Sequence, residues 1–321
     1  MPFCPITLEP IAEGESFSEA GLRSLHPRLT KLASLELAHD EQLRQARLRA
    51  DKMSVQGVQP KLSAVLRLKD SRFEIVDTGG RFILKPNPLP FTDVPANESL
   101  TMTMAATAGI DVPPHALVPT VDGGWIYVVR RFDREGRSDR IPVEDFAQLS
   151  GATRETKYDS SLEKVAKVVE EFCTFPALEK PKLARRLLFC FLTGNEDMHL
   201  KNFSVIVRDQ VVSLSPAYDL LNTTLVLEKA EEETALPLDG KKKKLTRKLW
   251  LDYFCSERLG LPTRQLDKLL ADLTRALPKW HDLIDRSHLP EAKKEVYHDL
   301  LKERSERLEI DPKEFLPIPA K

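Results

Sequence analysis

The stretch LTGNEDMHLKNFS, residues 192–204, constrains the fold and the chemistry of this chain more than any other segment. Within it Asn202 follows Asp197 by five positions, and a second acidic residue, Asp219, comes later in SPAYDLL. In enzymes that transfer phosphoryl groups, an Asp receives the proton of the acceptor hydroxyl, while an Asn five residues later and a further Asp hold magnesium ions. The order and spacing of the three residues therefore predict a phosphoryl-transfer site.

Two simpler interpretations of these residues stay open from the sequence. Asp and Asn are common turn residues, and a bare D-x-x-x-x-N pattern is more often a capped loop than a catalytic one. Asp219 also suits the N-cap of a helix that begins at Leu220. A strand and a turn precede Asp219, which favours the metal-binding interpretation because a metal-binding loop requires that order.

The segments GNEDMHLKNFS and AYDLL resemble the catalytic region of the HipA-type serine/threonine kinases, the toxins of bacterial toxin–antitoxin modules. The resemblance implies that Asp197 is the catalytic base and that Asn202 and Asp219 bind magnesium. It also implies that three further side chains lie beside the bound nucleotide: His199, Lys201 and Tyr218.

A turn built on Gly57 precedes an alternating strand pattern in MSVQGVQPKLSAVLRL, residues 53–68. A loop that covers phosphates needs glycine because the backbone must approach the anion closely. Without further context the segment would be interpreted as a plain hairpin. The sequence SVQGVQPK resembles the phosphate-binding loop of HipA-type kinases, in which the serine at the position of Ser54 is autophosphorylated. The residues that would line the phosphates are Gln56, Gly57, Val58, Gln59 and Lys61.

A strand lysine and a helix glutamate follow in the order that kinases use. Lys85 lies near the end of the expected strand RFILKP, and Glu98 lies in the expected helix PANESLTMTMAATAGI. In kinases such a pair orients the lysine toward the α- and β-phosphates. The alternative is an exposed lysine and a glutamate stabilised by the start of its helix.

The segment ALVPTVDGGWIYVVRRFDR predicts two strands around an Asp-Gly-Gly turn. Its end, RRFDR, is the expected connector between two lobes. By the resemblance, the adenine ring contacts this connector at Arg130, Arg131 and Phe132. The arginine-rich character fits a solvated strand end equally well.

Helices are expected through most of the remaining chain. Leu29, Leu32 and Leu35 give a partial helical stripe near the N-terminus. SLEKVAKVVEEFC and KLARRLLFCFLTG predict helices, and the second should deliver the chain to Asp197. TTLVL is expected as a strand or a turn. The run Lys241–Lys244 is interpreted as a solvated loop rather than a nucleic-acid site, because no aromatic residues interleave with it.

Composition excludes several classes of protein. A net charge of −1 over 321 residues argues against a strongly basic nucleic-acid binder. The four cysteines form no C-x-x-C pair, which disfavours a zinc site or a disulfide framework. No apolar run approaches the ~18 residues that span a membrane, and the N-terminus lacks the pattern of a secretory signal. We therefore expect a cytoplasmic protein without a membrane partner.

These patterns predict an α+β, two-lobed protein-kinase-like fold with a small β-rich N-lobe and a helical C-lobe. The expected divisions are a helical lead-in over residues 1–53, the N-lobe over 54–132 and the C-lobe over 133–321.

The resemblance implies a toxin that transfers the γ-phosphate of ATP, with Mg²⁺, to a serine or threonine of a protein. The expected substrate is an aminoacyl-tRNA synthetase, whose inhibition stops translation. The short segment before the phosphate loop is similar to HipT of the tripartite HipB–HipS–HipT systems, whose substrate is the tryptophanyl enzyme. HipB-like and HipS-like antitoxins would be its partners, and DNA would be reached only through an antitoxin complex. A small-molecule kinase and an inactive nucleotide-binding scaffold remain alternatives.

Overall fold

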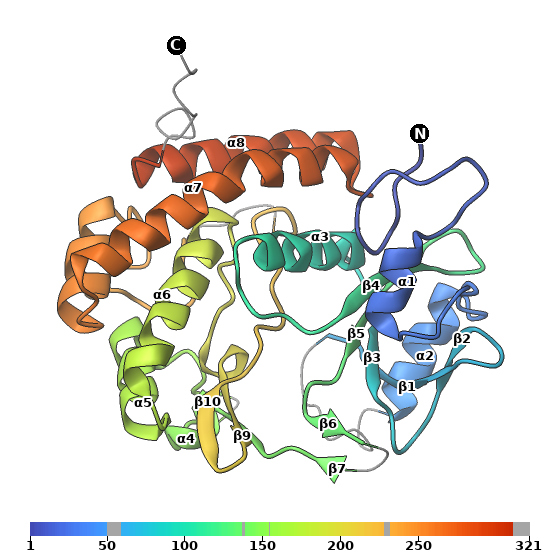
Figure 1. Ribbon diagram of the computed structural model, residues 1–321, viewed down its shortest axis with the longest axis horizontal. Helices are drawn as coiled ribbons and strands as arrows, with labels where there is room; N and C mark the ends of the chain where they lie inside the picture. The colour runs from blue at the N-terminus through green and yellow to red at the C-terminus, as the bar shows by residue number, and fades with distance from the viewer. Residues whose placement is uncertain (50–58, 137–138, 154, 228–231, 311–321) are drawn as a thin grey trace. The chain divides into compact units, whose positions relative to one another are not determined.

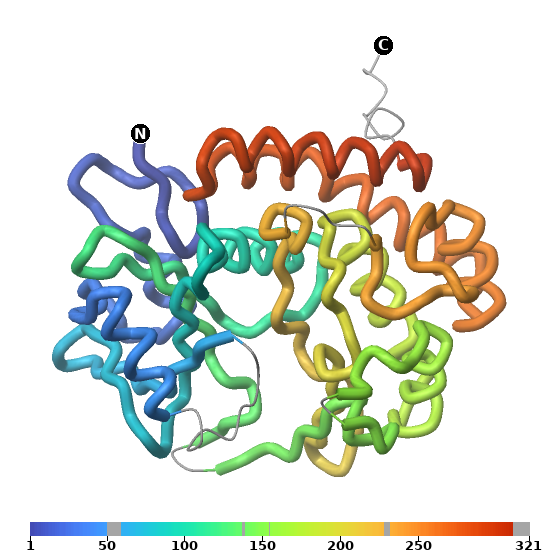
Figure 2. Tube along the Cα trace, turned by 180° about the vertical axis from the view of Figure 1, so that it is seen from behind, coloured from blue at the N-terminus to red at the C-terminus, as the bar shows by residue number. Residues whose placement is uncertain are grey.

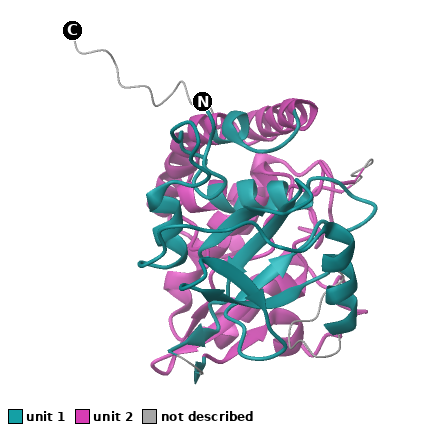
Figure 3. Cartoon of the chain, turned by 90° about the vertical axis from the view of Figure 1, so that its right-hand side faces the viewer, with its two compact units in different colours: residues 1–103, 113–140, 283–290 teal, residues 104–112, 141–282, 291–321 magenta. Residues whose placement is uncertain are grey.

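The strands and helices fall into two compact units in the computed structural model, which describes residues 1–49, 59–136, 139–153, 155–227 and 232–310 (Figure 3). Unit 1 comprises residues 1–103, 113–140 and 283–290. Unit 2 comprises residues 104–112, 141–282 and 291–321. Phe132, the expected end of the small lobe, lies inside unit 1, and the expected lead-in belongs to unit 1 as well.

Unit 1 is built on a five-stranded antiparallel sheet with the strand order β2-β1-β3-β5-β4 (Figure 1). The alternating segments predicted from the sequence form these strands, and the Asp-Gly-Gly turn joins the last two as expected. The bounds are β1 Leu62–Arg67, β2 Arg72–Ile75, β3 Phe82–Lys85, β4 His115–Pro119 and β5 Trp125–Arg130. A short hairpin of β6 (Arg134–Glu135) and β7 (Asp139–Arg140) follows the sheet.

One face of the sheet packs against the N-terminal residues. Because side chains alternate along a strand, Leu62 and Ala64 of β1 and Leu84 of β3 point to the same face, where they join a buried apolar cluster. The N-terminal segment contributes the helices α1 (Glu19–Leu25) and α2 (His39–Arg49) to this unit, and α1 contacts β4. The first residues of the chain are therefore part of the core of unit 1.

The helical stripe predicted from Leu29, Leu32 and Leu35 is wrong. The three leucines are buried, but the segment between α1 and α2 is not helical. Its backbone bonds other parts of the sheet unit instead, since the Leu35 amide donates to the Pro119 carbonyl at 2.9 Å. In this segment, hydrogen bonds to residues distant in sequence replace the i to i−4 bonds that a helix would make.

Lys85 lies on the opposite face of the sheet. Lys85 pairs in register with Tyr127 across β3 and β5. The helix α3, Val94–Thr107, begins in this unit, and its first turns are buried. This helix supplies Glu98 to Lys85, as described below.

Unit 2 is mainly helical and holds one small antiparallel sheet, in the order β10-β9-β8. Ser161 caps α5 through its side chain, and the long apolar run predicted as a helix forms α6. Both views show α7 and α8 running side by side, and His281 and His298 stack between them (Figures 1 and 2). The helices are α4 Phe146–Leu149, α5 Leu162–Phe172, α6 Pro176–Leu192, a π-helix Lys248–Arg258, α7 Thr263–Arg286 and α8 Glu291–Arg307; the strands are β8 Val143–Asp145, β9 Ser204–Arg208 and β10 Val211–Leu214.

The TTLVL segment forms turns rather than a strand. The Thr223 amide donates to the Gly194 carbonyl at 2.9 Å, and this bond holds the segment against the loop that follows α6. Over the described part of the chain, we find no helix with both the length and the apolar character that a membrane crossing requires.

Candidate active site

The loop that carries Asp197 begins where α6 ends, at Leu192. Gly194 follows with φ +67°, in the left-handed region that favours glycine. A Cβ at this position would lie 2.8 Å from Thr224 Oγ1 and closer still to Leu300. The loop then makes a single 3₁₀ turn, Leu200–Asn202, and enters β9. A helix and a strand therefore hold both ends of the loop.

Asp197 and Asn202 are joined directly. The Asn202 amide nitrogen, Nδ2, donates to the Asp197 carbonyl at 2.9 Å, and the His199 amide donates to the same oxygen at 2.8 Å. Asn202 is only 7% exposed. Because Nδ2 is used within the loop, the amide oxygen Oδ1 is the atom of Asn202 that suits a cation. The five-residue spacing thus lets the Asn202 side chain close the loop onto the Asp197 backbone.

Asp219 sits at a backbone position with φ +54°, and its carbonyl lies 3.4 Å from Nδ2 of Asn195. Buried Arg186 supports the segment before it by donating from Nη2 to the Ser215 carbonyl at 2.7 Å. Asp219 lies at a bend, and residues 220–222 are not helical, so Asp219 does not cap the start of a helix.

The oxygen donors of Asn202 and Asp219 fit magnesium, which prefers hard oxygen ligands and takes its remaining ligands from phosphates and water. Among the described residues, no group of three or more His, Cys, Asp or Glu side chains is placed to hold a metal ion.

Protein contacts engage the three side chains expected beside the nucleotide. Lys201 Nζ lies 3.1 Å from Asp145 Oδ2, and Asp145 also caps α4. The Tyr218 hydroxyl donates to the Lys201 carbonyl at 2.9 Å and lies 2.5 Å from the Ser204 hydroxyl. Tyr218 therefore ties the Asp219 segment to the catalytic loop.

His199 is held from outside the catalytic motif. Its Nε2 lies 2.7 Å from Lys157 Nζ, and its Nδ1 is buried with no hydrogen-bond partner among the described residues. Burial lowers the pKa of His199, and Lys157 lowers it further against the opposing effect of Asp197. A lysine ammonium can only donate, so His199 accepts at Nε2.

In unit 1, Lys85 and Glu98 form the predicted pair. Nζ lies 2.5 Å from Glu98 Oε1, and the two side chains are 3% and 1% exposed. The Lys85 ammonium also stands 5.5 Å from the centre of the Tyr127 ring. This arrangement rules out the alternative of an exposed strand lysine with a separate helix-start glutamate.

The connector residues make mainly local contacts. The backbone N–H groups of Arg130 and Arg131 donate to the carbonyls of Pro114 and Arg81, each at 2.8 Å. The Arg131 guanidinium binds Asp133 at 2.7 Å. An adenine ring at this connector would therefore have to use carbonyl oxygens or Phe132 instead of those two amides.

The predicted phosphate loop is described only in part. Ser54, Gln56, Gly57 and Val58 lie outside the described residues. Gln59 and Lys61 directly precede β1 and are partly buried.

Three side chains at the catalytic loop were not predicted from the sequence. Tyr158 donates from its hydroxyl to Asp197 Oδ1 at 2.6 Å, and Lys157 contacts His199 as described. Buried Arg304 of α8 lies 3.7 Å from Glu196, the neighbour of Asp197. The KYDSS segment and the last helix carry no local pattern that signals these contacts.

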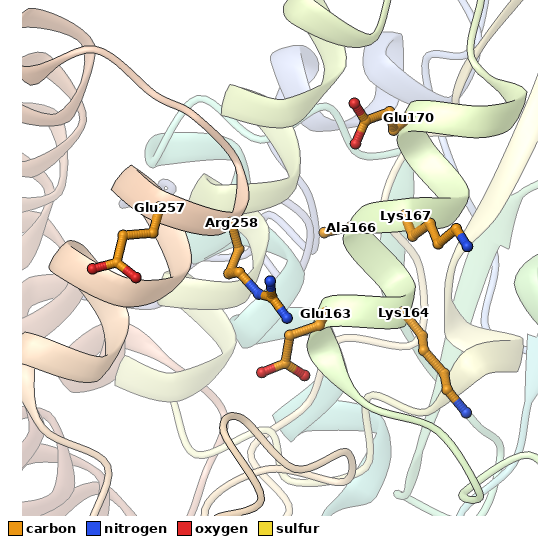
Figure 4. Close-up of a pocket in the computed structure, with 7 residues that line it drawn as sticks. All are labelled: Glu163, Lys164, Ala166, Lys167, Glu170, Glu257 and Arg258. Carbon is orange, nitrogen blue, oxygen red and sulfur yellow. The ribbon is translucent and has the colours of Figure 1, made fainter.

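A cavity of about 350 Å³ lies elsewhere in unit 2, between α5 and the π-helix (Figure 4). Arg258 points toward Glu163, while Lys164 and Lys167 point away from the π-helix. Its lining mixes charges of both signs and contains none of the residues of the catalytic loop, so it is not the candidate active site.

Comparison with solved structures confirms the predicted two-lobed, kinase-like α+β fold. HipA of Shewanella oneidensis, in its complex with HipB and operator DNA, aligns with a TM-score of 0.66 at 21% identity over 97% of this chain and 82% of its own. The Helicobacter pylori proinflammatory kinase CtkA aligns with a TM-score of 0.58 at 16% identity, over 82% and 94% of the two chains.

Sequence relatives are named as kinases. A "Putative kinase" of Haemophilus influenzae is 28% identical over 91% of this chain and 93% of its own length. The "Serine/threonine-protein kinase toxin HipA" of Shewanella oneidensis is 27% identical over 71% of this chain, which spans only 56% of that toxin. The family model for the HipA-like C-terminal domain matches residues 53–281. With the catalytic-loop geometry above, this match shows that the chain belongs to the HipA-like family.

Proposed function

We propose that this protein is an ATP- and Mg²⁺-dependent serine/threonine protein kinase that acts as the toxin of a toxin–antitoxin module. The observation that carries the proposal is the catalytic loop, in which Asn202 holds the Asp197 backbone and keeps its own Oδ1 for a cation. The names of the relatives support kinase chemistry and, in one case, a toxin.

Each residue of the site has a role in this proposal. Asp197 accepts the proton of the acceptor hydroxyl as the γ-phosphate is transferred. Asn202 and Asp219 would hold magnesium, which supplies charge neutralisation on the phosphates. Lys85, oriented by Glu98, binds the α- and β-phosphates.

The remaining nucleotide contacts follow from the family resemblance. His199, Lys201 and Tyr218 lie near the phosphates, Arg130–Phe132 contact the adenine, and residues 56–61 cover the phosphates. Ser54 is the proposed site of autophosphorylation. A phosphoserine there would compete with the phosphates of ATP for the same loop, because it adds about −1.5 to −2 charge at pH 7.

The proposed substrate is an aminoacyl-tRNA synthetase, with the tryptophanyl enzyme favoured, and the proposed restraining partners are HipB-like and HipS-like antitoxins. The resemblance of the SVQGVQPK loop supports a HipA-type kinase. The complex of the Shewanella relative with HipB and DNA supports an antitoxin partner of the HipB kind.

Transfer of phosphate from Mg·[γ-³²P]ATP tests this function directly. The wild-type chain should label itself and purified tryptophanyl-tRNA synthetase, whereas Asp197→Asn should reduce labelling by roughly 10²–10⁴-fold. Labelling of a small-molecule acceptor with no labelled protein would favour the metabolite kinase. No transfer to any acceptor despite Mg·ATP binding would indicate an inactive nucleotide-binding module.

A further inference from the structure

A short segment between α4 and α5 packs onto the catalytic loop. Besides the Tyr158–Asp197 bond, the Leu200 amide donates to the Lys157 carbonyl at 3.3 Å, and Lys157 Nζ contacts His199 Nε2. The Tyr158 and His199 rings meet edge to face, with centroids 5.0 Å apart. Four contacts from two adjacent residues thus hold the loop on both sides of Met198.

The bond from Tyr158 reaches the reacting group itself. A separation of 2.6 Å between a hydroxyl and a carboxylate is in the range of strong, charge-assisted hydrogen bonds. Partial burial and this bond raise the pKa of the Tyr158 hydroxyl, which therefore remains the donor, although the side chain as a whole is 41% exposed. The bond uses Oδ1, and it leaves Oδ2 as the oxygen that can face an acceptor hydroxyl.

Orientation of a carboxylate matters for proton transfer. A general base acts only when its oxygen lies within hydrogen-bond reach of the proton it removes. Asp197 has a fixed backbone, because His199 and Asn202 bond its carbonyl, but these bonds do not set the rotation of its side chain. Tyr158 supplies that missing constraint.

We propose that Tyr158 is a positioning residue that holds the Asp197 carboxylate in the orientation required for phosphoryl transfer, with Lys157 anchoring the same segment through His199. The proposal rests on the assignment of Asp197 as the base in the proposed function. It assigns a role in catalysis to a segment outside the catalytic loop and the Asp219 segment.

The test is Tyr158→Phe, which keeps the ring against His199 and removes only the hydroxyl. Tyr253→Phe is the matched control, because the Tyr253 hydroxyl also donates to a carboxylate, Glu163, at 3.1 Å but away from the loop. The readout is the rate constant for ³²P transfer from Mg·[γ-³²P]ATP into the chain itself. It is measured together with the ATP concentration at half-maximal rate and the melting temperature.

The Tyr158→Phe variant should lower the rate constant at saturating ATP by about ten- to a hundredfold, the cost of one hydrogen bond to a charged group. The half-saturating ATP concentration and the melting temperature should stay at wild-type values. Tyr253→Phe should leave all three quantities unchanged. Equal rates for Tyr158→Phe and the wild type would overturn the proposal.

A double variant separates this inference from the function on which it rests. If Tyr158 acts through Asp197, adding Tyr158→Phe to Asp197→Asn should change the residual rate by less than about twofold. Near-wild-type activity of Asp197→Asn would reject the proposed base itself. An inactive Asp197→Asn beside a fully active Tyr158→Phe would reject only the positioning role. A faster Tyr158→Phe variant, or phosphate mapped to Tyr158 by tandem mass spectrometry of its peptide, would also reject positioning, because the hydroxyl would then occupy the acceptor's place.

Discussion

At the scale of single residues, the candidate site includes buried charges and a strained backbone position, both of which are unfavourable without specific neighbours. Lys85 and Glu98 are both withdrawn from water, and each charge is tolerated because the other is near. Gly194 occupies a left-handed position where a side chain would also collide with its neighbours. Such positions tolerate little change, and two substitutions measure this.

Replacing Glu98 by Gln should destabilise unit 1 by about 3–5 kcal/mol, because a buried ammonium loses its counter-charge. The control is Glu74→Gln, which breaks the pair with Arg67, where the two side chains are 50% and 44% exposed. That exposed pair should contribute far less to stability than the buried pair, because water screens its charges. Urea unfolding of both variants gives the comparison, and equal losses would show that burial of Lys85 and Glu98 has no energetic consequence.

Replacing Gly194 by Ala should cost the strain of a left-handed Ala, about 1–2 kcal/mol, plus about 1–3 kcal/mol for the collision with Leu300 and Thr224. Gly151 has nearly the same φ, +66°, but nothing within 4 Å of the added Cβ. Gly151→Ala should therefore show the strain alone. Thermal unfolding measures the stability that each variant loses, and the difference between the two losses is the cost of the collision. Equal losses would show that the collision costs nothing.

At the scale of elements, the last helix supports the catalytic loop from within unit 2. Arg304 of α8 lies over the Phe191 ring at 4.6 Å and contacts both Glu196 and Glu233. The Thr224 hydroxyl donates to Glu196 at 3.1 Å. Helix α8 lies beyond the part of the chain that the family model matches, residues 53–281, yet it touches the neighbour of the proposed base.

The Glu196 cluster predicts a pH dependence of stability. Burial raises the pKa of Glu196 to about 7, with Glu233 and Glu232 acting in the same direction and Thr224 and Arg304 against it. The folded chain then binds a proton more tightly than the unfolded chain, so Glu196 should make the free energy of unfolding fall as pH rises from about 4.5 to about 7.

In the Glu196→Gln variant, the free energy of unfolding should depend less on pH between about 4.5 and 7. Urea titrations at a series of pH values measure this dependence. Glu233 belongs to the same cluster, but its pKa is lowered, so its contribution is lost at more acidic pH than the interval measured. An unchanged slope in the variant would contradict the assignment to Glu196.

At the scale of the whole molecule, ligand binding should be visible as stability. If Mg·ATP binds only the folded chain, a concentration of about 100 times its Kd adds about 2.7 kcal/mol to the free energy of unfolding. Asp219→Asn should remove most of this gain, because a charged oxygen ligand of a hard cation becomes neutral. Calorimetry with Mg·ATP, and with ATP plus EDTA, measures the effect. An identical Mg²⁺-dependent gain in Asp219→Asn would exclude Asp219 as a ligand.

The sequence alone determined the features whose cause is local. Alternating residues specified the strands of unit 1. The five-residue interval from Asp197 to Asn202 predicted a phosphoryl-transfer site, and the structure adds that Asn202 bonds the Asp197 carbonyl. The order of Lys85 and Glu98 likewise indicated a pair, because a strand and the helix after it lie near one another in the chain.

Only the tertiary structure decided the features whose partners are remote along the chain. Leu29, Leu32 and Leu35 have helical spacing, yet the hydrogen bond from Leu35 to Pro119 takes precedence over a local helix. Tyr158 stands 39 positions before Asp197, and Arg304 belongs to a different helix from the loop it supports. Hydrophobic periodicity in the sequence indicates which face of an element is buried, but it does not indicate which distant side chain packs against that face. Folding brings these groups together, and the orientation of the proposed base depends on that meeting.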